Sequence, residues 1–128
     1  MVSWSSKKKP TIAFSSAEAE YIATYATCTQ AIWLTCLFEY LGMDIDLPIS
    51  MHYYNLSMIA MTKNPVFHIR KKHIDIHHHF MRDLVEDGFI QFYHCPVDAQ
   101  ITDIFTKPFP KDHFFYLRIQ LGVQTLDI

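Results

Sequence analysis

Residues 15–42, SSAEAEYIATYATCTQAIWLTCLFEYLG, decide the fold. Ser15 is a suitable N-cap, and Glu18, three residues later, completes a capping box in which two side chains satisfy N–H groups of the first turn. Gly42 is the residue type that commonly ends a helix. The stretch therefore predicts one long helix that runs to about Leu41. The apolar residues that recur at helical spacing, and so predict its buried face, are Ile22, Ala23, Ala26, Trp33, Leu34, Leu37 and Leu41.

Shorter elements are predicted around this helix. Residues 48–54, PISMHYY, and 89–94, FIQFYH, are rich in aromatic and β-branched residues and predict strands. In a helix predicted over 69–87 and closed by Gly88, the apolar residues on one face are Ile69, Ile76, Phe80 and Leu84. The remaining predicted elements are a strand fragment in 2–14, a short helix in 55–63, a helical piece in 98–106, and a last helix from Asp112 to Gly122 with core aromatics at 113–116.

This order of strands and helices is an α/β pattern. A long amphipathic helix needs a sheet to pack on, yet only a strand fragment precedes it. The sequence therefore predicts an α/β domain that lacks its first strands.

The composition describes one globular unit. The chain has 128 residues, of which 50% are hydrophobic and 19% charged, enough for a single domain with its own core. A net charge of −2 gives no overall attraction to nucleic acid. The sequence shows neither a signal peptide nor an apolar run of about 20 residues, so we expect an intracellular protein without a membrane span. Cys28, Cys36 and Cys95 form no CxxC motif, which favours reduced thiols.

Histidines cluster in residues 71–83, KKHIDIHHHFMRD. His73 and His77 are four residues apart and could face the same way on a helix, which is a spacing that suits zinc. A third ligand would be needed, from His68 or elsewhere, and no HExxH motif or thiol pair is present. Structural histidines are therefore the better interpretation, and a zinc site is the alternative.

Three stretches together resemble one family. SWSSKKKPTIAFSSAEAEYIA (3–23), KNPVFHIRKKHIDI with HFMRD (63–83), and DAQITDIFTKPFP (98–110) resemble the ribonuclease H domain of Copia-type retrotransposon polyproteins, which follows the reverse transcriptase. The resemblance implies a ribonuclease H-like fold, which in the family has a five-stranded mixed sheet. Residues 1–123 would form such a domain without its first strands, followed by a tail of residues 124–128. It also implies cleavage of the RNA strand of an RNA/DNA hybrid.

The resemblance implies four acidic ligands for two Mg²⁺ or Mn²⁺ ions, which activate water and stabilise the leaving oxygen. It places two of them at Glu20 and Asp103. Tyr54 falls at the position of a third, where a neutral phenol is a poor substitute for a carboxylate. The first Asp would lie on a strand before Met1. With two of four ligands, we expect no hydrolysis by this chain alone.

Two further expectations follow from the resemblance. A nucleic-acid-binding module without catalysis is the alternative function, through two basic groups of residues, Lys7, Lys8, Lys9 and Arg70, Lys71, Lys72. The expected partners are therefore an RNA/DNA hybrid and the reverse transcriptase region of the parent polyprotein. In the family's fold the first strand lies at the centre of the sheet. Its absence would leave backbone groups and apolar surface uncovered, so we also expect marginal stability or aggregation in isolation.

Overall fold

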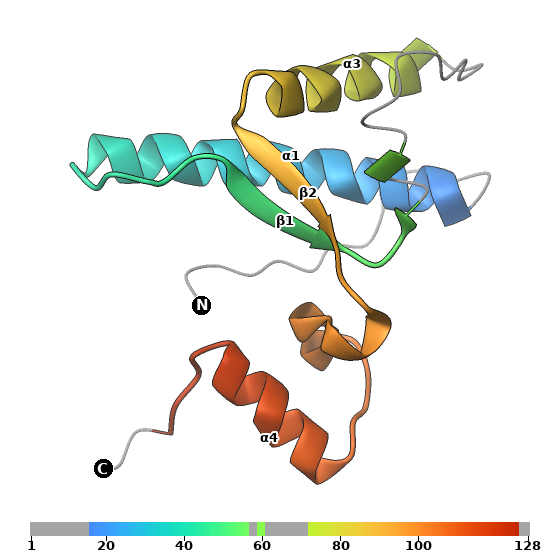
Figure 1. Ribbon diagram of the computed structural model, residues 1–128, viewed down its shortest axis with the longest axis vertical. Coiled ribbons are helices and arrows are strands. Elements are labelled where there is room, and N and C mark those ends of the chain that lie inside the picture. The colour runs from blue at the N-terminus through green and yellow to red at the C-terminus, as the bar shows by residue number, and fades with distance from the viewer. Residues whose placement is uncertain (1–15, 57–58, 61–71, 126–128) are drawn as a thin grey trace. The chain divides into compact units, whose positions relative to one another are not determined.

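The computed structural model describes residues 16–56, 59–60 and 72–125. They fall into two compact units, one that ends at Cys95 and one that begins at Pro96. The elements, labelled in Figure 1, are α1 (Ser16–Tyr40), β1 (Ile49–Tyr53), α3 (Lys72–Glu86) and β2 (Ile90–His94) in the first unit, and the 3-10 helices η1 (Val97–Ala99) and η2 (Ile101–Phe105) with α4 (Lys111–Gln120) in the second. The chain is therefore mixed α/β, as predicted. The predicted strand fragment at 2–14 lies outside the described residues.

Each of these three α-helices ends in the same local motif. After α1, the Gly42 N–H donates to the Glu39 carbonyl at 2.9 Å and the Met43 N–H donates to the Phe38 carbonyl at 2.9 Å. This pair of bonds is a Schellman motif. Gly88 closes α3 and Gly122 closes α4 with equivalent bonds. The predicted glycine stops are therefore confirmed.

Gly42→Ala is expected to lower the free energy of unfolding by about 1–2 kcal/mol, because Gly42 has φ +74° and a Cβ is strained in the left-handed region. No heavy atom lies within 4 Å of the position that this Cβ would occupy, so the loss comes from the backbone conformation rather than from a clash. Urea unfolding measures it. Gly42→Asn is the control, because asparagine tolerates this region better and should lose less. Equal urea midpoints for the alanine variant and the native chain would contradict the prediction.

The strands β1 and β2 form a two-stranded parallel sheet, in register from Ile49 with Ile90 to Tyr53 with His94. The Ile49 N–H donates to the Phe89 carbonyl at 2.9 Å, and the Cys95 N–H donates to the Tyr53 carbonyl at 2.7 Å. Alternate residues of a strand point their backbone groups to opposite edges. Ser50 and His52 therefore present their N–H and C=O groups at the other edge of β1, where no described residue forms a strand.

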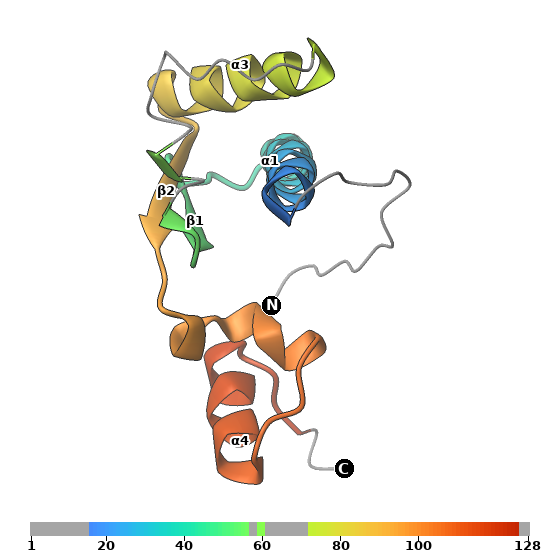
Figure 2. The ribbon, with the colours of Figure 1, turned by 90° about the vertical axis from the view of Figure 1, so that its right-hand side faces the viewer.

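One face of this sheet builds the core. Both α1 and α3 lie on the same side of the two strands, and α1 is seen end-on in Figure 2. The buried cluster between them is formed by Tyr21, Cys28, Met51, Ile59, Met81, Ile90 and Phe92. The opposite face of the sheet carries exposed residues, namely Ser50, His52, Gln91 and Tyr93. Parallel sheets are usually covered on both faces. This unit therefore has one covered face and one uncovered face within the described residues.

The predicted buried face of α1 is wrong at most of its positions. Ile22 and Leu34 are partly buried, whereas the other predicted residues, Ala23, Ala26, Trp33, Leu37 and Leu41, are exposed. The buried residues described in this helix are Tyr21, Thr24, Cys28 and Thr35. The physical reason lies in the two threonines. Their hydroxyls donate to carbonyls four residues earlier, at 2.8 Å for Thr24 and 3.0 Å for Thr35, so both side chains can be buried without unpaired polar atoms.

The predicted buried face of α3 is wrong at one position. Ile76 is 64% exposed, while Phe80 and Leu84 are partly buried as predicted. The most buried residues of this helix are Met81, at 0% exposure, and His78, at 5%. The helix is therefore turned so that a histidine and a methionine face the core.

In the second unit, the buried residue of α4 is Leu117, which is 1% exposed. Of the aromatics predicted as core, Phe114, Phe115 and Tyr116 are exposed, so this prediction is wrong for them. Phe115 instead contacts the Arg118 guanidinium, whose carbon lies 4.8 Å from the ring centroid.

No helix among the described residues is long and apolar enough to span a bilayer.

Candidate functional site

The carboxylate of Glu20 receives two hydrogen bonds from the residues that follow β1. The Tyr54 hydroxyl donates to Glu20 Oε1 at 3.0 Å, and the Asn55 side-chain amide donates to Glu20 Oε2 at 2.5 Å. Glu20 lies in the second turn of α1 and is partly buried, whereas Tyr54 is exposed. Both carboxylate oxygens therefore hold the carboxyl end of β1 against α1. We call Glu20, Tyr54 and Asn55 the Glu20 site.

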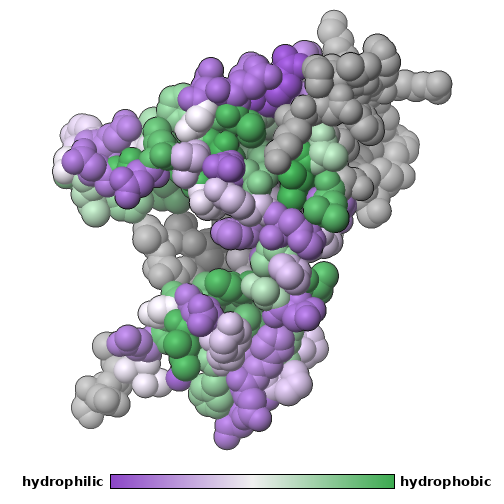
Figure 3. Space-filling view, viewed as in Figure 1, coloured by the Kyte–Doolittle hydropathy of each residue, from purple (hydrophilic) through white to green (hydrophobic). Residues whose placement is uncertain are grey.

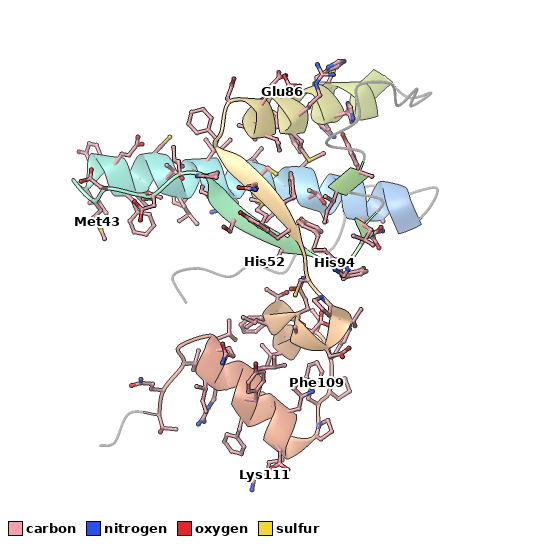
Figure 4. All side chains as sticks on the ribbon, viewed as in Figure 1. Met43, His52, Glu86, His94, Phe109 and Lys111 are labelled. Atoms are coloured by element: carbon pink, nitrogen blue, oxygen red, sulfur yellow. The ribbon has the colours of Figure 1, made fainter. Side chains whose placement is uncertain are left out.

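The neighbouring residues explain why this site forms. Tyr21, next to Glu20, is buried in the core, and Tyr53, next to Tyr54, points to the same core from β1. Burial raises the pKa of Tyr53 above its usual value, and hydrogen bonds with the side chains of Thr24 and Thr27 oppose this rise. Because Tyr53 is held against α1, Tyr54 and Asn55 leave the strand beside Glu20. Figure 4 labels His52 and His94 near this end of the two parallel strands.

The Glu20 site can orient a carboxylate, but it does not fit a pair of metal ions. Its hydrogen bonds involve a charged acceptor and are stronger than bonds between neutral groups. It holds one full negative charge, and Tyr54 directs its proton at that charge. Two-metal sites rely on several carboxylate oxygens. Within the described part of the chain, no three His, Cys, Asp or Glu side chains form a group that could hold a metal ion.

Asp103 belongs to the second unit, in the first turn of η2. Its Oδ2 atom accepts a hydrogen bond from Lys107 Nζ at 2.6 Å, and Lys107 is half exposed. Exposed ion pairs of this kind contribute about 0–1 kcal/mol to stability. The carboxylate that the resemblance assigns to metal binding therefore makes a local salt bridge along the chain.

The structure describes few of the other predicted site residues. Lys7, Lys8, Lys9, Arg70 and Lys71 lie outside the described residues, and Lys72 begins α3 with a side chain that is not described. The nucleic-acid surface predicted from them therefore stays a prediction.

The zinc hypothesis rests on His73 and His77. The side chain of His73 is not described, and the ring of His77 stacks on Tyr25 with 3.8 Å between centroids. The buried His78 stacks on Tyr21 with 6.5 Å between centroids. Two histidines of the cluster therefore join α3 to α1 through ring contacts, and the zinc site stays a prediction.

Sequence reasoning missed Asn55 as a member of the Glu20 site. The available signal was its position, because a polar side chain directly after the carboxyl end of a strand is often placed to act at that end. Its partner is 35 residues away in the sequence, and no local pattern predicts such a contact.

Tyr54→Phe is expected to lower the free energy of unfolding by about 1 kcal/mol, because it removes one donor from the Glu20 carboxylate at a partly exposed position. Tyr40→Phe is the matched control, since Tyr40 is 87% exposed at the end of α1. Urea unfolding of the single variants and of Tyr54→Phe with Glu20→Gln forms a double-mutant cycle. A coupling energy of zero in this cycle would contradict a stabilising Tyr54–Glu20 bond.

Proteins similar to this chain are retrovirus-related Pol polyproteins from transposons. The chain is 35% identical to that of transposon RE1 and 34% identical to that of transposon RE2, both from Arabidopsis thaliana, over 122 residues in each case. It is 31% identical over 124 residues to that of transposon TNT 1-94 from Nicotiana tabacum. These matches cover 95–97% of this chain but only 8–9% of each polyprotein. No family model matches the chain, and no solved structure matches it.

The similarity therefore extends over nearly the whole chain. It supports a region derived from a retrotransposon Pol polyprotein, which is the broader part of the resemblance seen in the sequence.

Proposed function

We propose that this chain derives from the ribonuclease H region of a Copia-type polyprotein and does not cleave RNA/DNA hybrids by itself. One observation carries the proposal. Glu20 and Tyr54 occupy two positions that the resemblance predicts as ligands of one metal cluster, and they are 34 residues apart in sequence yet joined by a 3.0 Å hydrogen bond. The similarity to Pol polyproteins over 95% of the chain supports the same origin.

Tyr54 accounts for the expected lack of activity. Hydrolysis by two metal ions needs negatively charged oxygens to hold the ions in place. A tyrosine hydroxyl has an ordinary pKa near 10 and is neutral at pH 7. Here that hydroxyl donates a hydrogen bond to the Glu20 carboxylate. The hydrogen bond occupies a carboxylate oxygen at which a metal ion would otherwise bind. Tyr54 and Asn55 thus orient Glu20 without supplying the missing charge.

The resemblance places the first carboxylate of the cluster on a further strand, and we propose that the segment preceding the matched region in the related polyproteins supplies this strand.

An assay on a labelled RNA/DNA hybrid with Mg²⁺ or Mn²⁺ tests the proposal. The three proteins are the native chain, its Tyr54→Asp variant, and a restored chain that combines Tyr54→Asp with the segment preceding the matched region in the transposon RE1 polyprotein. We expect cleavage by the restored chain alone. The matched control is the restored chain with Glu20→Gln, which should be inactive because it loses a ligand charge.

Each outcome decides one part of the proposal. Cleavage by the native chain would overturn the inactivity. A restored chain that is folded by circular dichroism but inactive would overturn the assignment to ribonuclease H. Full activity of the restored Glu20→Gln chain would remove Glu20 from the site.

A further inference from the structure

One side of α4 carries two positive charges around a single aromatic ring. The carbon of the Arg118 guanidinium lies 4.8 Å from the centroid of the Phe115 ring, and Lys111 Nζ lies 5.8 Å from the same centroid. The three residues are spaced by four and three positions, which places them on one face of a helix. We call Lys111, Phe115 and Arg118 the α4 row.

Neither charge of the α4 row pairs with a carboxylate in the part of the chain that the structure describes. Lys107, shortly before the helix, differs because its Nζ atom lies 2.6 Å from Asp103 Oδ2. Asp112 follows Lys111 in the chain and so lies about 100° around the helix from it. Figure 4 labels Lys111, whose side chain points away from α4. The row therefore holds two cations without a counter-ion among the described residues.

The ring of Phe115 supports the Arg118 guanidinium. Contact between a cation and the face of an aromatic ring is favourable, and Arg118 is partly buried, so its side chain is held in place. Its Nε atom is buried without a hydrogen-bond partner. The two terminal nitrogens donate to no described residue and are not among the buried atoms that lack a partner. They are therefore available to a ligand.

Two cations held around one ring favour a bound anion. Like charges repel each other, and an anion that contacts both removes this repulsion. A guanidinium binds phosphate oxygens through two parallel N–H groups, and lysine adds a compact point charge. A phosphate monoester carries about −1.5 to −2 at pH 7 and three acceptor oxygens, whereas a carboxylate carries a single charge. Figure 3 shows hydrophilic residues beside hydrophobic ones on the surface of α4.

We propose that the α4 row binds a phosphate group with about two negative charges, either free phosphate or a phosphate monoester at the end of a nucleic-acid strand. The terminal nitrogens of Arg118 donate to two phosphate oxygens and Lys111 donates to the third, while Phe115 holds the guanidinium. The row belongs to the second unit and Glu20 to the first, so the proposal stands whether or not the Glu20 site ever supported hydrolysis.

NMR of the Arg118 Nε–H group follows binding at the site itself. The probes are inorganic phosphate, acetate, and one short oligonucleotide prepared with and without a 5′-phosphate. We expect inorganic phosphate to bind at least about tenfold more tightly than acetate, because it carries the larger charge. Tighter binding of the phosphorylated oligonucleotide than of its unphosphorylated form would identify a strand end as the source of the phosphate. Equal binding of the two forms would identify free phosphate.

Four variants test the three roles, with phosphate binding measured by ³¹P NMR. Arg118→Gln and Lys111→Gln should each weaken binding at least about fivefold, because each removes a charged donor. Phe115→Leu keeps both charges and should weaken binding by a smaller factor, because the guanidinium loses its support. Lys107→Gln is the matched control and should leave binding unchanged, since its ammonium group is already paired with Asp103.

Three results would overturn the proposal. They are equal affinity for phosphate and acetate, unchanged affinity in Arg118→Gln, and an equal loss in Lys107→Gln and Lys111→Gln, which would mean that only the overall charge matters. Circular dichroism verifies that each variant is folded. Arg118→Lys keeps the charge but not the paired N–H groups, so it should bind less tightly than the native chain and decides the role of Arg118 if the glutamine variant does not fold.

Discussion

Met81→Ala is expected to lower the free energy of unfolding by about 2–5 kcal/mol, because it leaves a cavity at the centre of the core. Met81 is fully buried and packs in the cluster that contains Tyr21, Ile90 and Phe92. Domains are commonly stable by only about 5–15 kcal/mol, so this loss is a large fraction of the total. Urea unfolding at constant m-value measures it.

The control for this variant is Ile76→Ala on the same helix. Ile76 is exposed, so its truncation should change the free energy of unfolding by less than about 0.5 kcal/mol. The pair also tests the orientation of α3. A larger loss for Ile76→Ala than for Met81→Ala would mean that the face predicted from the sequence is the buried one.

Raising the pH above 9 is expected to destabilise the protein through Cys28. Burial raises the pKa of the Cys28 thiol from 9.0 to about 12, and a backbone hydrogen bond opposes the rise only in part. The side chain has no exposed surface, and its sulfur lies 3.9 Å from the sulfur of Met51. The folded protein therefore keeps the thiol proton at pH values where the unfolded chain releases it.

The sign follows from this difference. Because the folded pKa is raised, the contribution of Cys28 to stability is fully present below pH 9 and is lost as the pH rises toward 12. The complete loss is on the order of 4 kcal/mol. Burial also raises the pKa of Tyr53, so this residue adds a loss of the same sign above pH 10.

Urea unfolding between pH 7 and 11, with reductant present, measures the effect. Cys28→Ala should be less stable at pH 7 but should lose less stability on going to pH 11. Cys36→Ala is the control, because Cys36 is exposed and its removal should leave the slope unchanged. Identical slopes for Cys28→Ala and the native chain would refute the role of Cys28.

The positions of the elements could be predicted from local signals, whereas the faces they bury could not. The motifs closed by Gly42, Gly88 and Gly122 involve only residues close in sequence, so their chemistry is visible in a single stretch. The buried faces depend on partners elsewhere in the chain. Thr24 and Thr35 can be buried because each hydroxyl donates to its own helix, but the elements that pack against α1 decide that this face is the buried one.

The candidate site shows the same division. The resemblance points to Glu20 and Tyr54, and the structure joins them by a hydrogen bond. Asn55 completes the site through a contact across 35 residues that no spacing rule predicts. The Asp103–Lys107 pair, in contrast, has a spacing of four residues that is typical of salt bridges in helical segments, so the sequence contained its signal.

The parallel pairing of β1 with β2 has a consequence for synthesis on the ribosome. Ile49 pairs with Ile90, which is translated 41 positions later. At about 5–20 residues per second, β1 waits roughly 2–8 s after it is made before its partner strand exists. The glycine stop of α1 can form during this interval because it needs only neighbouring residues. A nascent chain of this kind would thus complete the end of its first helix while β2, the strand that pairs with β1, is still to be made.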